Sequence, residues 1–264
     1  MKKLSKMRVA ALAAAVAFGV AADVPARPVT MMSFNVRMGC GLNGNFRLEK
    51  GSLGCLPEVA RVIRNADPDW VAVQEIDRLT ERAGGIDQTA ELARLCGLKG
   101  YFVKKIPLRG GDYGLAILSK EEPLSVSKIM VPGSAHTRAL MVASFRDYTV
   151  VCTHFPLKPH LREVAAEIAR LNLAGDGKPV FLAGDINAEP AEKSVEILKK
   201  DFAVLSDETK PTFPSDVPRV CIDYIFVDKA HAGKVKVLER QTIAAPEATD
   251  HCALVVKAEL SGDK

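Results

Sequence analysis

Acidic, amide and imidazole side chains stand at or beside the ends of apolar, strand-like runs along this chain. In sequence order they are Asn35, Glu75, His154, Asp185, Asn187, Asp223, Asp250 and His251, and Tyr113 opens a further run. Carboxylate and amide oxygens are ligands that Mg²⁺ prefers, and an imidazole can act as acid, base or cation near neutral pH. Brought together by a β-rich fold, such residues form a metal-dependent hydrolytic site.

Three of these residues show why no single motif is enough to identify a catalytic or metal-binding site. Asp185 and Asn187 follow a glycine at the end of an apolar run, and a two-residue spacing in extended chain puts both side chains on one face. The carboxylate can bind metal or accept a proton, and the amide can donate to an anion. Alone, this sequence is more often a simple turn. Glu75, at the end of its own run, would alone be read as a solvated residue.

The histidines fall into two groups. His251 follows Asp250 just before the last apolar run, and Asp223 is able to hold that imidazole in one tautomer. His154 ends another apolar run and supplies a second imidazole. The other histidines lack such settings and are expected at the surface or in loops: His136, His160 and His231.

The runs themselves predict the fold class. Apolar, β-branched runs typical of strands cover 29–36, 70–74, 101–106, 114–119, 124–131, 139–145, 149–153, 180–183, 222–227, 234–238 and 252–258. Helical spacing of apolar residues appears after Pro57 and over 87–95, 159–173 and 190–200. Several strands follow one another without a helix, so the pattern predicts an α/β fold with two mixed sheets packed together under helices. The stretch 206–218 is expected to be a loop on the substrate side.

The N-terminus is typical of an export signal. Four basic residues precede an apolar stretch that ends in small residues before Asp23. We expect a signal peptide over 1–22, a short linker over 23–28 and a catalytic domain over 29–260. The alternative is an uncleaved anchor. Cleavage would leave a periplasmic or secreted protein with no stable membrane insertion.

Charge and composition bear on the substrate. The formal net charge of the whole chain is +4, and residues 1–22 carry four Lys or Arg and no acid, so the remainder is near neutral. Nucleic-acid-binding surfaces are basic and rich in aromatic residues, whereas aromatics make up 6% of this chain. A small phosphodiester or lipid head group is therefore favoured over nucleic acid. Of the six cysteines, Cys40 and Cys55 flank a glycine-rich loop that a disulfide would close, and the others are expected as buried thiols.

Taken together and in order, these segments resemble the endonuclease/exonuclease/phosphatase superfamily, which includes deoxyribonuclease I and the neutral sphingomyelinases. The matching segments are 32–37, 73–77, 113–119, 153–155, 182–187, 222–226 and 249–251. The resemblance implies a four-layer α/β sandwich with two central mixed β-sheets. It also implies hydrolysis of a phosphate-ester substrate that depends on Mg²⁺, with Mn²⁺ as an alternative ion.

The resemblance assigns roles to single residues. Glu75 would be the principal metal ligand, with Asn35 and Asp250 near the metal. Asp185 would orient or deprotonate the attacking water, and Asn187 would help to bind the phosphate. His251, paired with Asp223, would contact the scissile phosphate, and His154 matches a histidine of the deoxyribonuclease and sphingomyelinase branches.

Three more residues are expected to bind substrate: Tyr113, Arg138 and Arg109. Surface arginines are, however, as often simply solvated. Leu115 departs from the superfamily pattern, because relatives often carry Asn after this Tyr-Gly pair. A non-catalytic binding module on the same scaffold would have lost Glu75 or His251, and both are present. We expect a monomeric phosphodiesterase or phosphatase.

Overall fold

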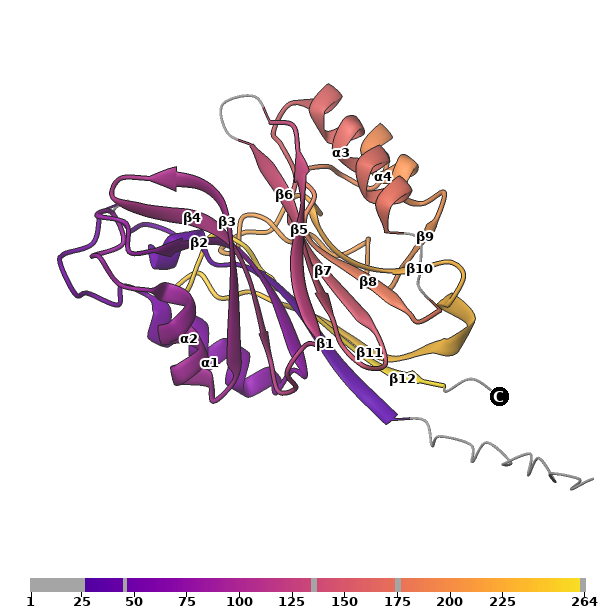
Figure 1. Ribbon diagram of the computed structural model, residues 1–264, viewed down its shortest axis with the longest axis horizontal. Coiled ribbons are helices and arrows are strands. Elements are labelled where there is room, and N and C mark those ends of the chain that lie inside the picture. Colours follow the sequence, from indigo (N-terminus) through magenta and orange to yellow (C-terminus); the bar gives the residue numbers. More distant parts are fainter. Residues whose placement is uncertain (1–26, 45–46, 134–136, 174–176, 262–264) are drawn as a thin grey trace, which may run out of the picture.

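Two six-stranded sheets stack face to face, and helices cover the outer face of each (Figure 1). The computed structural model describes residues 27–44, 47–133, 137–173 and 177–261. The expected signal peptide and His136 lie outside these residues. Within the described part of the chain, no helix is long and apolar enough to cross a membrane.

Both sheets are mixed, as the sequence predicts. The first has the order β11-β12-β1-β2-β4-β3 and the second the order β5-β6-β7-β8-β10-β9. The first contains β1 (Arg27–Asn35), β2 (Trp70–Arg78), β3 (Lys99–Leu108), β4 (Gly111–Ser119), β11 (Val235–Ile243) and β12 (Ala253–Leu260). The second contains β5 (Ser125–Val131), β6 (Arg138–Ser144), β7 (Thr149–His154), β8 (Val180–Asp185), β9 (Phe202–Val204) and β10 (Asp223–Asp228). Each sheet has one parallel pair, β1 with β2 and β7 with β8, among antiparallel neighbours.

The helices complete the four layers. The first sheet is covered by α1 (Leu56–Ala66) and α2 (Gln88–Cys96), and the second by α3 (Pro159–Asn172) and α4 (Lys193–Leu198) (Figure 1). Short 3-10 helices, η1 (Arg37–Gly39) and η2 (Ala232–Lys234), follow β1 and precede β11. The α4 helix is shorter than expected because it begins only after Glu192, its N-cap residue. The three-residue β9 was not expected, since so short a strand leaves no alternation to detect.

Alternation along the central strands builds three separate cores. Met31 and Trp70 point into the core between the two sheets, while their neighbours Met32 and Val71 point toward α1 and α2. A third core lies between the second sheet and the other two helices. Because successive strand residues face opposite sides, one apolar run serves two layers at once. This is why the central strands are apolar along nearly their whole length.

The structure decides two smaller points that the sequence left open. Cys40 and Cys55 are free thiols, so the disulfide across the glycine-rich loop is not formed. Cys40 is instead buried beside Met38 and Tyr113. His231 lies in the turn between β10 and η2, as a loop residue, and it is buried, with its Nδ1 2.6 Å from Oδ2 of Asp228.

Candidate active site

Strand register brings the chemical residues of the second sheet together. Parallel pairing of β7 with β8 places His154 beside Asp185. Antiparallel pairing of β10 with β8 places Asp223, the first residue of β10, opposite the same Asp185. Three residues separated by 31 to 69 positions in sequence therefore meet at one end of the sheet through backbone pairing alone.

The first sheet brings its residues to the same end. Asn35 ends β1 and pairs in register with Gln74 of β2, next to Glu75. His251 lies just before β12, which runs antiparallel to β1. The amide Nδ2 of Asn35 crosses to the other sheet, because it donates to Asp185 Oδ2 at 3.0 Å and to Glu75 Oε1 at 3.3 Å. The site therefore joins the two sheets.

Glu75 does not end its strand, as the sequence suggested, because β2 continues to Arg78. A bulge between Gln74 and Ile76 leaves it out of the ladder, and its φ of 55° lies in the left-handed region. Such a conformation costs a non-glycine residue about 1–3 kcal/mol and is typical of functional sites. The residue with this conformation, Glu75, places its carboxylate in the lining of the active-site hollow. Asn187, with a φ of 54°, has the same kind of backbone.

A hollow of about 550 Å³ lies where these residues meet, within the size range of small-molecule sites. Its lining is formed by Met38, Glu75, Arg82, Ile106, Leu108, Tyr113, Arg138, His154, Leu157, Asp185, Asn187, Phe213, Ile222, Asp250 and His251. Asn35 and Asp223 are buried and bonded to lining residues. Another hollow of about 400 Å³, beside α1, contains none of the expected residues.

Arg109 is the one expected residue that the structure places elsewhere. It lies with Gly110 in the tight turn between β3 and β4, is exposed, and has a left-handed φ of 42°. It does not line the hollow. Arg138 and Tyr113 do line it, so two of the three expected substrate-binding residues remain at the site.

Asp185 is held by contacts to both of its oxygens. Oδ1 accepts from the backbone N–H of Asn187 at 2.9 Å, and Oδ2 accepts from Asn35. His154 Nε2 lies 3.5 Å from Oδ2. Burial raises the pKa of Asp185 to about 7, with the cation of His251 opposing the rise. A carboxyl group with a pKa near neutrality suits the exchange of a proton with water.

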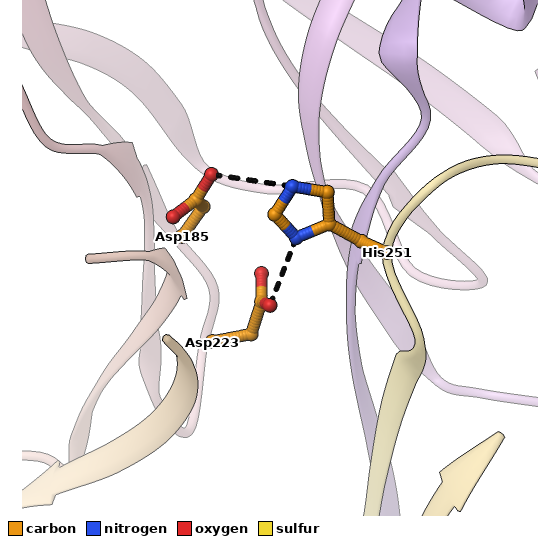
Figure 2. Close-up of side chains that lie close together, drawn as sticks. All are labelled: Asp185, Asp223 and His251. Atoms are coloured by element: carbon orange, nitrogen blue, oxygen red, sulfur yellow. Dashed lines mark hydrogen bonds and ion pairs between the residues drawn. The ribbon is translucent and has the colours of Figure 1, made fainter. Parts of the chain in front are cut away.

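His251 and Asp223 form a buried ion pair (Figure 2). His251 Nδ1 lies 2.9 Å from Asp223 Oδ2, which also accepts from Thr212 Oγ1 at 2.7 Å. Burial alone would lower the pKa of His251, but the charges of Asp223, Asp185 and Asp250 outweigh it and raise the pKa to about 10. His251 is therefore a cation, and its Nε2 lies 3.8 Å from Asp185 Oδ2.

His154 is in the opposite state. Burial, together with the positive charges of Arg138, Lys105 and His251, lowers the pKa of His154 well below its ordinary value. Its Nδ1 lies 4.0 Å from Glu75 Oε1 and has no hydrogen-bond partner among the described residues. The site thus holds one cationic and one neutral imidazole. Environments that push two pKa values apart in this way are typical of catalytic sites.

The donors of this site fit a divalent metal ion at Glu75. Its carboxylate lines the hollow, and its only hydrogen bond to a described side chain comes from the amide of Asn35. Asp250, on the same hollow, is partly neutralised by Arg37, whose Nε lies 3.2 Å from Oδ2. Asp185, Asp223 and His251 also offer ligand atoms within 4.8 Å of one another. However, a cationic imidazole cannot coordinate a metal, so Glu75 is the better anchor.

Four residues at the site were not identified from the sequence. Thr212 bonds Asp223, and Phe213 lies against the His251 ring with centroids 4.8 Å apart. Both belong to the loop 206–218, whose substrate-side placement was expected. Arg37 pairs with Asp250, and Lys105 is buried beside Tyr113. The sequence did contain a sign of the buried Lys105. Successive residues of a strand face opposite sides of the sheet, so Lys104 and Lys105 cannot both point to the same face.

Comparison with known proteins identifies the family of this chain. The model of the Endonuclease/Exonuclease/phosphatase family matches residues 32–251. An endonuclease/exonuclease/phosphatase from Beutenbergia cavernae is 19% identical, with a TM-score of 0.71 over 89% of this chain and 72% of that one. One from Bacteroides vulgatus is 20% identical, with a TM-score of 0.68 over 89% of this chain and 100% of that one.

A mannosyl-6-phosphatase from Bacteroides thetaiotaomicron is 15% identical, with a TM-score of 0.65 over 87% of this chain and 99% of that one. No curated protein sequence matches the chain. These structures share the four-layer fold, and the family model covers most of the chain, including every expected catalytic residue. The chain therefore belongs to the endonuclease/exonuclease/phosphatase family of phosphoesterases.

Proposed function

We propose that the protein is a metal-dependent hydrolase of small phosphate esters, such as a phosphorylated metabolite or a phosphodiester head group. One observation carries this proposal: a buried carboxyl group, a cationic imidazole and a second carboxylate line one hollow. Asp185, His251 and Glu75 supply them. Size also supports a small substrate, since the hollow is about 550 Å³. The near-neutral charge of the chain beyond residue 22 gives little attraction for nucleic acid.

The chain's own residues account for binding and proton transfer. Asp185 accepts a proton from the water molecule that attacks phosphorus. As the new P–O bond forms, the P–O bond to the leaving group breaks, and the leaving oxygen takes up a proton from solvent. Asn35 and the backbone of Asn187 hold the carboxylate oxygens of Asp185 in place. His251 presents a permanent positive charge to the phosphate, and Asp223 maintains that charge. Asn187 uses one amide hydrogen on the carbonyl of Phe155 at 3.0 Å and has a second for the substrate. A Mg²⁺ or Mn²⁺ ion on Glu75 would supply further charge neutralisation.

Removal of divalent metal is expected to abolish hydrolysis. Without a metal, Glu75 would repel an anionic phosphate. EDTA-treated protein should regain activity with Mg²⁺ or Mn²⁺ better than with Ca²⁺, since Mg²⁺ holds tighter octahedral geometry. The Glu75→Gln variant should weaken Mn²⁺ binding, measured by electron paramagnetic resonance of free Mn²⁺, by at least about 10-fold. Full activity in metal-free buffer would show that the mechanism is wrong.

A substrate panel tests the function itself. Purified protein with Mg²⁺ is offered bis-p-nitrophenyl phosphate, sugar and inositol phosphates, sphingomyelin and plasmid DNA. We expect turnover of the small esters and little cleavage of plasmid. If DNA is cleaved in preference to the small esters, the protein is a nuclease and the proposal is wrong. Binding of a panel member without any turnover, in protein that binds Mn²⁺, would point to a non-catalytic module.

We also propose that the protein is exported and loses residues 1–22. The support is the basic start, the apolar stretch and the small residues before Asp23. Intact mass and N-terminal sequencing of the protein recovered from its native host should place Asp23 first. An exported protein that begins at Met1 or Lys2 would contradict this.

A further inference from the structure

Lys105 of β3 is buried next to the active site, and no described residue forms an ion pair with it. The residue is 5% exposed, and its Nζ makes no hydrogen bond to any described residue. The Nζ lies over the ring of Tyr113, 4.1 Å from the centroid, and Tyr113 lines the active-site hollow. Burial is the main reason that its pKa falls to about 7, and the positive charge of Arg138 lowers it further. Burial of an ammonium group without a counter-ion is costly, so this arrangement needs a reason.

Arg138 of β6 is a second basic residue at the same place. It is half-buried, it lines the hollow, and its guanidinium makes no ion pair or side-chain hydrogen bond within the described ranges. Arg138, Tyr113 and His154 line the same hollow, and the charge of Arg138 lowers the pKa of His154 and of Lys105. By contrast Arg82, the other arginine of the lining, is neutralised by two bonds to Asp77, at 2.7 and 2.8 Å.

The two free cations lie to one side of the catalytic residues. Glu75 is on β2 and Asp185 on β8, whereas Lys105 is on β3 and Arg138 on β6. Lys105 is two strands from Glu75 in the first sheet, and Arg138 is two strands from Asp185 in the second. The displacement has the same direction in both sheets, because β3 packs against β5 and β6, whereas β2 packs against β7 and β8. A molecule with its scissile phosphate between Glu75 and Asp185 would therefore extend past His154 toward this pair. A dianionic group there would meet the charge of Arg138 and would favour the protonated form of Lys105, and neither side chain has an ion-pair partner among the described residues.

We propose that Arg138 and Lys105 form a second anion subsite, which binds a phosphate group of the substrate other than the one that is cleaved. Arg138 reaches the hollow and contacts the anion directly, since a guanidinium can donate two parallel hydrogen bonds to a phosphate. Lys105 lies behind the Tyr113 ring and contributes its charge. The substrate class is then a small molecule with two phosphate groups. The hydrolysis of such a molecule rests on the proposed function, but the binding of phosphate does not.

The first test is binding of inorganic phosphate to the full-length, metal-free protein by isothermal titration calorimetry. Arg138→Met and Lys105→Met should each raise the Kd by at least about 10-fold, which is a loss of about 1.4 kcal/mol. The matched control is Lys104→Met, which removes the neighbouring lysine of β3, exposed and paired with Asp112 at 3.2 Å. It should stay within about 2-fold of the wild type. Unchanged binding in both site variants would overturn the subsite.

Lys105→Met should fold, because methionine replaces an unpaired buried charge with an apolar side chain of similar length. Thermal melting followed by circular dichroism should show an equal or higher Tm than the wild type. If this variant nevertheless fails to fold, Arg138→Met, at a half-exposed position, decides the question alone.

The second test compares a monophosphate and a bisphosphate of the same small polyol, with Mg²⁺ present. The wild type should have at least about 10-fold lower KM for the bisphosphate than for the monophosphate, and Arg138→Met should raise the KM for the bisphosphate to that for the monophosphate. An equal loss on both substrates would assign the two cations to the scissile phosphate and overturn the inference. If neither substrate is cleaved but the variants lose phosphate binding, the proposed function fails and the subsite stands.

Discussion

Asp185→Asn is expected to lower kcat by about 10³-fold or more, equal to about 4 kcal/mol of transition-state stabilisation. The amide cannot accept a proton from the attacking water, although it keeps the shape of the carboxylate. The carboxylate stands at the centre of the site, in contact with Asn35, Asn187 and His154. The wild-type rate should also fall as the pH drops through a value at or below about 7, because burial raises the pKa of this group.

Steady-state kinetics on whichever substrate the panel reveals would measure this loss, with circular dichroism as the folding control. Asp201→Asn is a matched variant, since Asp201 is exposed and lies outside the hollow, bonded to Arg170. It should retain the wild-type kcat. A folded Asp185→Asn protein with near-wild-type kcat would show that another group activates the water.

Much of this fold follows from the sequence for a simple reason. The central strands are buried on both faces, so they appear as continuous apolar runs, and a polar residue stands out where each run stops. Asn35, His154 and Asp185 all mark real strand ends. Once β7, β8 and β10 pair, their ends must meet, and the site residues of the second sheet meet with them. The four layers follow from the same alternation of apolar runs and helical patterns.

The parts that the sequence did not reveal depend on side-chain partners across the fold. Glu75 bulges out of β2 because of the register in which β2 pairs with β4. This register cannot be read from the sequence of β2 alone. The contacts of Thr212 with Asp223 and of Arg37 with Asp250 join segments far apart in the chain. Arg109 was expected at the substrate rim, yet it is an exposed residue of the tight turn after β3 and does not line the hollow.

His251→Ala is expected to cost about 10³-fold in kcat, whereas His154→Ala should cost about 10²-fold. The difference follows from charge, because His251 is a cation held by Asp223, while His154 is neutral. His160 is an exposed histidine, so His160→Ala is the control substitution and should leave kcat unchanged.

The charge state of His251 can be measured directly. Its pKa is raised above the unfolded value, so the ion pair stabilises the fold fully below about pH 6.5, and this contribution is lost as the pH rises through about 10. Nitrogen chemical shifts of the ring should therefore report an imidazolium throughout pH 6 to 9, and Asp223→Asn should lower the midpoint. A ring that titrates near pH 6.5 in the wild type would remove the fixed cation from the mechanism. The predicted gap between His251→Ala and His154→Ala would then lose its physical basis.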